Sequence, residues 1–485
     1  MSTGFKHLFR FFSDEERRNI HEASKQVLAT TGLAVRNARA RELLVAHGCT
    51  LDASTERVYL PEQLVEACRA SFEGRYTFTA REPEFDVNVP GEAPCIVTAS
   101  SASRILDFST GEQRDATSSD IASIARLINE LPGYDVFSIS TLAADASREL
   151  FSVDRLYPAL KYCQKPIRTT TMGMPDLLSV LEFGYALAGG REAYGERPFI
   201  NHHYCPVISP LTFDVDSTEA VTYVLEQGYP VYATICPNGG MTSPMSMLGT
   251  LIVGNAEFLA INCYFQMVRP GTPVLYAYLP NIAYMRTGTY TSGSVECAML
   301  EMAHTEMAEF YGVPSGGYIG QTDSHAPDYQ AGQEVSMSAT GAALTGASLL
   351  NIGGLLDSLV SFDYAKAVLD SEVGMNLKRL ARGMEYGAEG LERNLREIDE
   401  VGPGGIFMME DQTLENTPTI CYYSDLASRD IRSAWEAAGS KPADVRAREQ
   451  AQKILSAPAR PLLSEETEDA IRELFPNLVS GEPAR

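Results

Sequence analysis

The chain has 485 residues, which is too many for one minimal domain and enough for one large barrel with additions or for two or three ordinary domains. Its hydrophobic fraction of 45% is ordinary for a globular protein with a sizeable core. The formal net charge of −24 argues against nucleic acid as a partner and favours solubility.

The sequence predicts no targeting or membrane segment. No apolar run reaches the roughly 18 residues that a membrane span needs, and the N-terminal stretch MSTGFKHLFRFFSDEER lacks the apolar core of a signal peptide. The nine cysteines are scattered and form no CxxC pair, which is typical of reduced thiols. These features predict a cytoplasmic protein whose first residues form an ordered arm.

The first 92 residues are predicted to form an N-terminal α+β cap. Ser13 followed by Glu16 is a capping box that predicts a helix to about residue 31. Pro61 predicts the start of another helix, because its missing N–H costs nothing there. The other predicted elements are a helix at 38–47 and strands at 57–60, 76–79 and 85–89.

From residue 93 to residue 385 short β-rich runs alternate with helical stretches, at spacings suited to β-α units. This pattern predicts a (β/α)8 TIM barrel. The alternative is a doubly wound open sheet, which is weakened by the absence of a GxGxxG or P-loop motif. The eight predicted strands are 95–99, 135–140, 166–172, 198–204, 230–235, 273–278, 316–320 and 349–353.

The last part of the chain, residues 386–485, is predicted to be a C-terminal helical extension packed on the barrel. It begins with an irregular stretch of glycine and proline and continues with helical patterns. The single tryptophan, Trp435, is interpreted as a packing anchor. The predicted helices lie near 429–438, 443–455 and 465–474.

The active site of a (β/α)8 barrel lies at the carboxyl ends of its strands. The densest set of polar residues there follows the seventh strand, in GGYIGQTDSHAPDYQAGQE. Glycines allow a ligand to approach closely, and Glu334, on the first turn of a small apolar helix, would point inward and need a partner. We therefore predict that the segment from Gln321 to Glu334 belongs to the active-site mouth. The alternative is a solvated loop before a helix capped by Asp328.

A second candidate site is the segment HHYC at 202–205. The spacing His203-x-Cys205 could form half of a zinc site with Cys236 or Cys263. Adjacent strand residues face opposite ways, so only one of the two histidines can face the lumen. A hydrogen-bonded barrel histidine is favoured over a metal ligand, and no other metal-binding spacing is present.

Several of the 23 tyrosines fall at predicted strand ends. Aromatic faces together with carboxylates form a box for a quaternary ammonium ion, and each good cation–π contact is worth roughly 0.5–2 kcal/mol. The alternative is that these tyrosines are the ordinary amphipathic residues of a barrel wall.

Four stretches of the chain resemble the trimethylamine methyltransferase family. They are INHHYCPVISPL at 200–211, the run 316–334 with its Asp-Ser and Asp-x-Gln-x-x-x-Glu, GGLLDSLVSFDYAKAVLDSEVG at 353–374, and ARPLLSEETEDAIREL near the C-terminus. The resemblance covers nearly the whole chain in the same order. All residues are standard, so the chain is similar to the branch of this family that lacks pyrrolysine.

The resemblance implies a methyltransferase of methylamine metabolism, of the kind used in methanogenesis, built on a TIM barrel. The methyl donor would be a quaternary amine such as glycine betaine, and the acceptor would be the Co(I) of a separate corrinoid protein. The cobalamin or corrinoid would therefore belong to that partner, with no cofactor or metal held by this chain. A homo-oligomer is also expected, since the cap and the C-terminal helices offer surfaces.

On this interpretation the site residues follow from the strand ends. Gln321, Asp323 and Glu334 are predicted to be catalytic. The predicted substrate-binding residues are His202, His203, Tyr204, Tyr276, Tyr278, Tyr318, His325 and Phe362. Two alternatives remain open, namely a zinc-dependent barrel methyltransferase that uses His203 and Cys205, and a non-catalytic betaine-binding protein.

Overall fold

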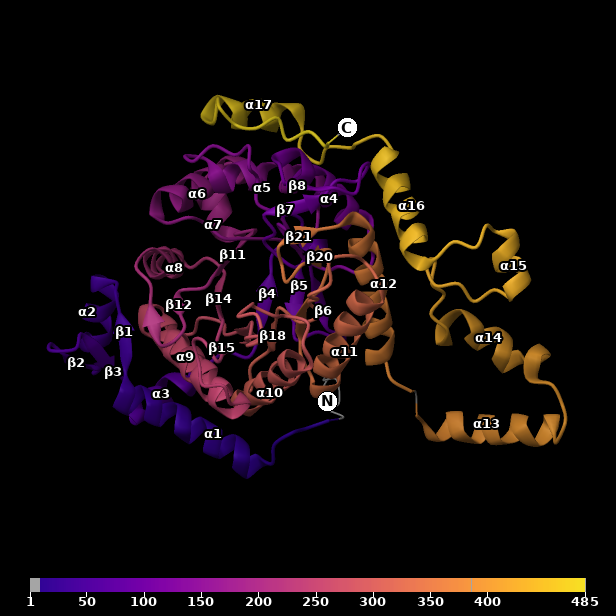
Figure 1. Cartoon of the computed structure of the whole chain (residues 1–485), viewed down its shortest axis with the longest axis horizontal. Coiled ribbons are helices and arrows are strands. Elements are labelled where there is room, and N and C mark those ends of the chain that lie inside the picture. The colour runs from indigo at the N-terminus through magenta and orange to yellow at the C-terminus, as the bar shows by residue number, and fades with distance from the viewer. Residues whose placement is uncertain (1–8, 385, 485) are drawn as a thin grey trace.

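The computed structural model of the chain, which describes residues 9–384 and 386–484, contains a (β/α)8 barrel (Figure 1). Eight parallel strands pair in chain order, and a bridge between Val97 and Val136 joins the first strand to the second and nearly closes the ring. The predicted barrel is confirmed, although most strands are shorter than predicted. They are β6 (Cys95–Val97), β9 (Phe137–Ser138), β10 (Ile167–Thr169), β11 (Ile200–Tyr204), β14 (Val231–Ile235), β16 (Tyr276–Tyr278), β18 (Ser315–Gly317) and β19 (Leu349–Asn351).

One long helix follows each barrel strand and covers the outside of the ring (Figure 1). Several of these helices begin at a side-chain cap, as at Ser294, Asp328 and Asp363, whose oxygens accept a backbone N–H of the first turn. The helices are α4 (Ser118–Glu130), α5 (Phe151–Tyr162), α6 (Met174–Ala188), α8 (Asp216–Gln227), α9 (Met247–Val268), α10 (Val295–Tyr311), α11 (Tyr329–Thr345) and α12 (Tyr364–Ala381).

A β-hairpin closes the amino end of the barrel. Its strands, β4 (Tyr76–Phe78) and β5 (Val87–Val89), pair in antiparallel fashion. Its apolar side chains belong to one buried cluster with inward-facing residues of the barrel such as Tyr232 and Leu275. Asn201 of β11 fastens the hairpin, since its amide exchanges hydrogen bonds of 2.9 and 3.0 Å with the backbone of Thr79. The side chains of the hairpin therefore fill the amino-terminal end of the barrel lumen.

The N-terminal residues are built into the barrel wall. Helices α1 (Asp14–Gln26) and α3 (Glu62–Arg69) pack on α9, and the predicted capping box of Ser13 and Glu16 is present. Strand β1 (Leu33–Val35) pairs with β13 (Thr212–Phe213), which lies in the loop after β11. The proposed boundary at residue 92 falls between β5 and β6.

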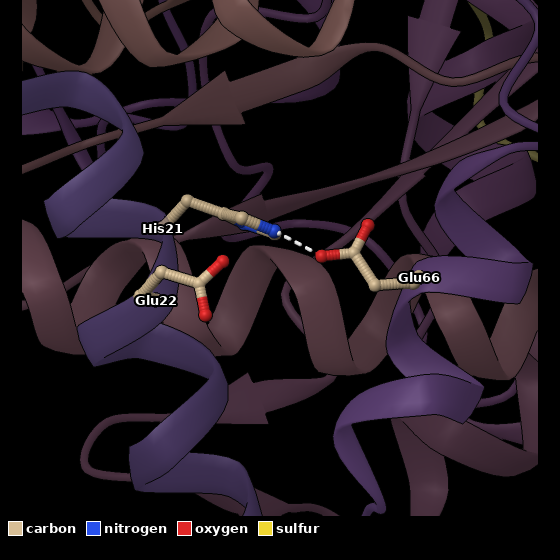
Figure 2. Close-up of side chains that lie close together, drawn as sticks. All are labelled: His21, Glu22 and Glu66. Carbon is tan, nitrogen blue, oxygen red and sulfur yellow. Dashed lines mark hydrogen bonds and ion pairs between the residues drawn. The ribbon is translucent and has the colours of Figure 1, made fainter. Parts of the chain in front are cut away.

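His21 on α1 and Glu66 on α3 fasten these two helices together (Figure 2). The imidazole contacts the Glu66 carboxylate at 2.7 Å and the hydroxyl of Tyr311 at 3.0 Å. Among the described residues, His21, Glu22 and Glu66 are the one trio that could hold a metal ion. However, Lys25 already contacts Glu66 at 2.8 Å and Glu22 at 3.0 Å, so these carboxylates have cationic partners.

Helix α9 is the one described helix that is long and apolar enough to cross a membrane. In the structure 78% of its apolar window is buried. It contacts α1 and α3 on one side and β14 on the other, and it contains the buried polar residues Asn255, Glu257 and Asn262. These contacts identify it as a core helix of the fold.

The C-terminal extension has two parts. Helix α16 (Ala443–Ser456) packs on α12 and α4, and α17 (Glu465–Leu474) packs on α6. In contrast, α13 (Ala388–Val401), α14 (Asp411–Ile420) and α15 (Arg432–Ala437) contain no buried residue and project away from the barrel (Figure 1).

Candidate active site

Arg168, in the middle of β10, points into the barrel and is 1% exposed. Its guanidinium donates from Nε to the Ser138 hydroxyl at 2.9 Å and from Nη1 to the Tyr232 hydroxyl at 2.7 Å. Its Nη2 lies 3.0 Å from the hydroxyl of Ser100 and 3.4 Å from that of Tyr318. Residues from several barrel strands therefore converge on one cation.

Asn351, at the end of β19, completes this set. With its amide oxygen turned toward the guanidinium, it accepts hydrogen bonds of 2.7 and 3.0 Å from Nη1 and Nη2. All these partners are neutral, and no described carboxylate forms an ion pair with Arg168. A buried charge without a counterion is costly, so this cation is electrostatically incomplete.

Arg168 nevertheless remains charged. Burial works against the charge, but the oxygens of Tyr232 and Tyr318 outweigh it and raise the pKa of the guanidinium above its ordinary value. The ring of Tyr318 also stacks against it, with its centroid 5.5 Å from the guanidinium carbon. Because the Tyr318 oxygen accepts from Arg168, its own proton is left for another acceptor. The Tyr318 hydroxyl also lies 3.3 Å from that of Ser100, so its proton can go to Ser100 or to a ligand in the positive field of Arg168.

His203 lies in the same polar layer. Its Nε2 contacts the hydroxyl of Thr234 at 2.7 Å, and its ring lies 4.9 Å from that of Tyr232 and 6.4 Å from that of Tyr318. Burial, helped by the charge of Arg168, lowers the pKa of this imidazole well below its ordinary value. The side chain is therefore neutral at physiological pH.

Two cysteines lie near the ends of neighbouring strands at the mouth. Cys205 follows β11, Cys236 follows β14, and their thiols contact each other. Chiefly through that contact, the pKa of Cys205 is lowered and that of Cys236 is raised. All nine cysteines are free thiols.

Exposed methionines lie on the loops at the carboxyl ends of the strands. Met245 and Met285, from the loops after β14 and β16, flank Gly240 and come close to each other. Thioether side chains are flexible and polarisable, and they suit a surface that must adapt to a partner. The most exposed methionines of these loops are Met172, Met241, Met245 and Met285.

Of the predicted substrate-binding residues, Tyr318 and His203 reach this polar lumen. Tyr276 and Tyr278 do not, because their rings face the helices. Tyr276 stacks on Phe258 of α9 at 3.7 Å between ring centroids, and Tyr278 shares a hydrogen bond with Thr305 of α10. Side chains alternate along a strand, and here the intervening Leu275 and Ala277 occupy the lumen.

His202 and Tyr204 also face away from the lumen, as the alternation requires once His203 points inward. Their rings are parallel, with centroids 6.4 Å apart. The Tyr204 hydroxyl contacts that of Thr171 at 2.6 Å, and neither nitrogen of His202 has a hydrogen-bond partner. Burial lowers the pKa of His202 to about 4.

The three predicted catalytic residues hold loops together. The Asp323 carboxylate accepts from the backbone N–H of Ser292 at 2.8 Å, and Glu334 accepts from the Thr322 hydroxyl at 2.6 Å and the Asp323 N–H at 2.9 Å. The amide of Gln321 donates to a backbone oxygen at the end of β19. These side chains are engaged inside the protein, although the segment does follow the seventh strand.

His325 and Phe362 lie elsewhere. The His325 side chain is 87% exposed and contacts Asp357, which raises the pKa of the imidazole. Phe362 is fully buried and packs on Tyr364, with ring centroids 5.4 Å apart. It belongs to a small four-stranded sheet of β20 (Leu355–Leu356), β21 (Ser361–Phe362), β7 (Arg104–Leu106) and β8 (Gln113–Asp115).

The structure does not assemble the zinc site that the sequence left open. Cys205 contacts Cys236, whereas Cys263 contacts Cys68 at the interface of α3 and α9. Within residues 9–384 and 386–484, the trio with metal-ligand spacing is the one between α1 and α3, and it does not include His203.

The arrangement of eight parallel strands around a buried polar cluster defines a (β/α)8 barrel protein. The family profile described as "Trimethylamine methyltransferase (MTTB)" matches residues 4–476. The chain belongs to this family, and it is a methyltransferase.

Two curated relatives agree with this assignment, and one solved structure shares the fold. The chain is 30% identical to trimethylamine methyltransferase MttB of Desulfitobacterium hafniense DCB-2, over 92% of this chain and 89% of the relative. It is 29% identical to the glycine betaine methyltransferase of Desulfitobacterium hafniense Y51, over 88% of each. It also shares the fold of the hydroxylamine complex of MtmB, with a TM-score of 0.52 and 11% identity over 96% of this chain and 93% of that one.

Proposed function

We propose that the chain transfers a methyl group from a carboxylate-bearing quaternary amine, glycine betaine or a related betaine, to the Co(I) of a corrinoid protein. The observation that carries this proposal is the buried guanidinium of Arg168, which has only neutral partners. A betaine carboxylate would supply the missing negative charge, whereas trimethylamine has no group that could. The name of the glycine betaine methyltransferase relative supports the same class of donor.

The substrate would bind with its carboxylate toward the floor of the lumen. There the hydroxyl of Tyr318 can donate a hydrogen bond to it, and Arg168 stabilises the charge through the hydroxyls that it polarises. The ammonium end would then point toward the mouth. This orientation holds the methyl group where a nucleophile from outside can reach it.

The reaction needs little acid–base chemistry from the protein. The bond between the methyl carbon and nitrogen breaks with its electron pair going to nitrogen, so a neutral tertiary amine leaves and needs no proton. The neutral state of His203 and the internal engagement of Asp323 and Glu334 are consistent with this route. The corrinoid of the partner protein would supply the nucleophile. The exposed methionines on the loops at the carboxyl ends of the strands offer an apolar surface against which the partner could fit. The task of this chain is to bind, to orient and to exclude water.

The direct test supplies purified protein with reduced cobalamin and one amine at a time, and follows the cobalamin spectrum. We expect methyl transfer from glycine betaine or another betaine and none from trimethylamine. Failure with a whole panel of betaines would overturn the proposal. Betaine binding without transfer, even with a corrinoid protein present, would instead identify a binding protein. The free thiols favour a reducing, cytoplasmic setting for this activity.

A further inference from the structure

The thiols of Cys205 and Cys236 lie where two neighbouring barrel strands end. β11 and β14 pair in parallel, and each cysteine directly follows its strand. Side chains alternate along a strand, so each cysteine points the same way as the residue two positions before it. Those residues, His203 and Thr234, contact each other at 2.7 Å across the two strands. The cysteines repeat this offset one step nearer the mouth, which explains why their thiols contact each other.

This mouth pair, Cys205 and Cys236, is accessible from outside. Cys205 is exposed and Cys236 is half-buried, although the residues on either side of Cys205 are buried. A second pair of thiols in contact, Cys68 of α3 and Cys263 of α9, is buried between those two helices and is called the buried pair. The two pairs therefore share their chemistry and differ in access.

The mouth pair also divides its two protons unequally. The contact with Cys236 lowers the pKa of the Cys205 thiol, and the charge of Arg168 adds to this effect, while the surrounding protein opposes it. The same contact raises the pKa of Cys236 well above its ordinary value. The thiolate is the form of cysteine that reacts with peroxides. An accessible cysteine of lowered pKa beside a second thiol is the arrangement of a redox-sensitive site.

We propose that Cys205 and Cys236 form an oxidation site, at which hydrogen peroxide or another hydroperoxide converts the two thiols into a disulfide. The Cys205 thiolate attacks one oxygen of the peroxide, the O–O bond breaks, and the departing hydroxide takes up a proton and leaves as water. The sulfur of Cys236 then attacks the sulfenic acid formed on Cys205 and gives up its own proton. A second water leaves as the S–S bond forms, so two thiols are oxidised and one peroxide is reduced.

The disulfide would be reversible. A dithiol reductant attacks it through a mixed disulfide and restores both thiols. In a reducing compartment such disulfides are transient, and they serve catalysis or redox sensing. The mouth pair lies near the hydroxyl of Tyr318. Under the proposed function, on which this consequence rests, the disulfide would join two strands at the mouth and stop methyl transfer until it is reduced.

The test treats the folded, full-length protein with hydrogen peroxide and then blocks the remaining thiols with an alkylating reagent. A protease that cleaves after glutamate separates the two cysteines of the mouth pair at Glu219 and Glu226, and it separates Cys236 from Cys263 at Glu257. Mass spectrometry should find the two peptides of the mouth pair joined, and dithiothreitol should release them. Both thiols of the buried pair should be alkylated only after the protein is unfolded.

Three variants assign the roles of the two thiols. Cys236→Ser should accumulate a sulfenic acid on Cys205, which dimedone traps, because the second thiol is missing. Cys205→Ser should give little dimedone label on Cys236. The matched control is Cys421→Ser, which removes the other exposed cysteine and should form the disulfide as the wild type does. Circular dichroism should show a folded barrel in all three.

The outcomes separate this proposal from the proposed function. Peptides of the mouth pair that are not joined after peroxide treatment, or equal oxidation of the mouth and buried pairs, would overturn the oxidation site. Equal dimedone labelling of the two serine variants would overturn the assignment of Cys205 as the attacking thiol. Full methyl transfer by the oxidised protein would overturn the effect on activity. Absence of methyl transfer before oxidation would count against the proposed function alone, because peptide mapping does not depend on activity.

Discussion

Under the proposed function, the side chains around Arg168 bind the substrate, whereas Asp323 and Glu334 hold loops of the barrel together. The guanidinium is fixed by neutral residues of several strands, so it is positioned before any substrate arrives. Such preorganisation reduces the cost of binding. Single substitutions of these residues therefore test the proposed substrate class most directly.

Replacement of Arg168 by methionine is expected to raise KM for glycine betaine by roughly 30-fold or more, because the loss of one partner of a buried charge pair costs about 2–5 kcal/mol. Steady-state kinetics would measure this change. Added betaine should raise the unfolding temperature of the wild type but not of the variant. The control Arg168→Lys keeps the positive charge but loses the planar guanidinium with its several N–H donors, and it should give an intermediate KM. A methionine variant with the wild-type KM would exclude Arg168 from substrate binding.

A second pair of variants tests which tyrosines face the substrate. Tyr318→Phe removes a hydroxyl from the lumen and should raise KM about tenfold, since a hydrogen bond to a charged group contributes about 1.5–3 kcal/mol. Tyr278→Phe is the matched control, because its hydroxyl contacts Thr305 on the helix side. It should lower the unfolding temperature slightly and leave KM unchanged. Equal effects of the two variants on KM would contradict the orientation of β16.

At the scale of elements, the loops after strands β16, β18 and β19 are tied together by one carboxylate. Asp323 accepts from Ser292, in the loop after β16, and from the hydroxyl of Ser358, in the segment after β19. We expect Asp323→Ala to destabilise the protein by about 1–3 kcal/mol, because buried donors lose their acceptor. The effect on kcat should stay within about tenfold. A thousandfold loss of kcat at unchanged stability would return Asp323 to a catalytic role.

Glu257 joins α9 to the loop after β11 and makes the free energy of unfolding depend on pH. It accepts from the Ser209 hydroxyl at 2.7 Å and the Leu211 N–H at 2.9 Å, and burial raises the pKa of its carboxyl to about 7 from an ordinary 4.5. The folded state therefore holds this proton more tightly than the unfolded state does. The stability that the protonated form contributes is complete below pH 4.5 and is lost as the pH rises to 7.

Glu257→Gln should remove this dependence. Relative to the wild type, the variant should gain on the order of 3 kcal/mol between pH 4.5 and pH 7, as expected for a difference of this size in pKa. Denaturant unfolding of both proteins at several pH values would measure the gain. A difference in stability that stays constant across this range would show that Glu257 does not titrate in the folded protein.

Eight strands and the helices between them could be predicted, because β-rich runs and amphipathic stretches alternate clearly along the chain. The direction of the side chains could not be predicted for strands such as β16. Both faces of a parallel barrel strand are buried, so the sequence does not alternate between polar and apolar residues. In β16 the large tyrosines face the helices because Tyr232 and Tyr76 already fill the floor of the lumen.

The same limit explains which site residues the sequence missed. The density of polar residues predicted an active-site segment at 321–334, where the structure shows side chains that hold loops together. The residue that carries the proposed function, Arg168, stands alone in IRT at 167–169, and its partners come from strands far apart in sequence. A single charged residue in an otherwise uncharged predicted barrel strand was the signal available. The positions of Tyr318 and His203 in the lumen could be predicted because each lies at or next to the end of its strand.

At the scale of the whole molecule, the barrel and the projecting segment 388–416 should behave as separate units. Replacement of this segment, which contains no buried residue, by a short glycine-rich linker is expected to leave the barrel folded, because α12 and α16 contact each other and the buried Leu426 is kept. Thermal unfolding should change little, and betaine-induced stabilisation should persist. Loss of the folded barrel on deletion would show that this segment supports the fold directly.

The hairpin of β4 and β5 has a consequence for the order of events in turnover. Because it fills the amino end of the barrel and Asn201 holds it there, a substrate would have to enter the lumen from the carboxyl ends of the strands. Under the proposed function, the amine must enter before the corrinoid protein docks, and the demethylated amine must wait until that protein departs. A lumen that is closed at one end therefore imposes a fixed order of substrate binding, partner docking and product release. An excess of the methyl acceptor protein should then slow the reaction, by closing the entrance on empty or product-filled barrels.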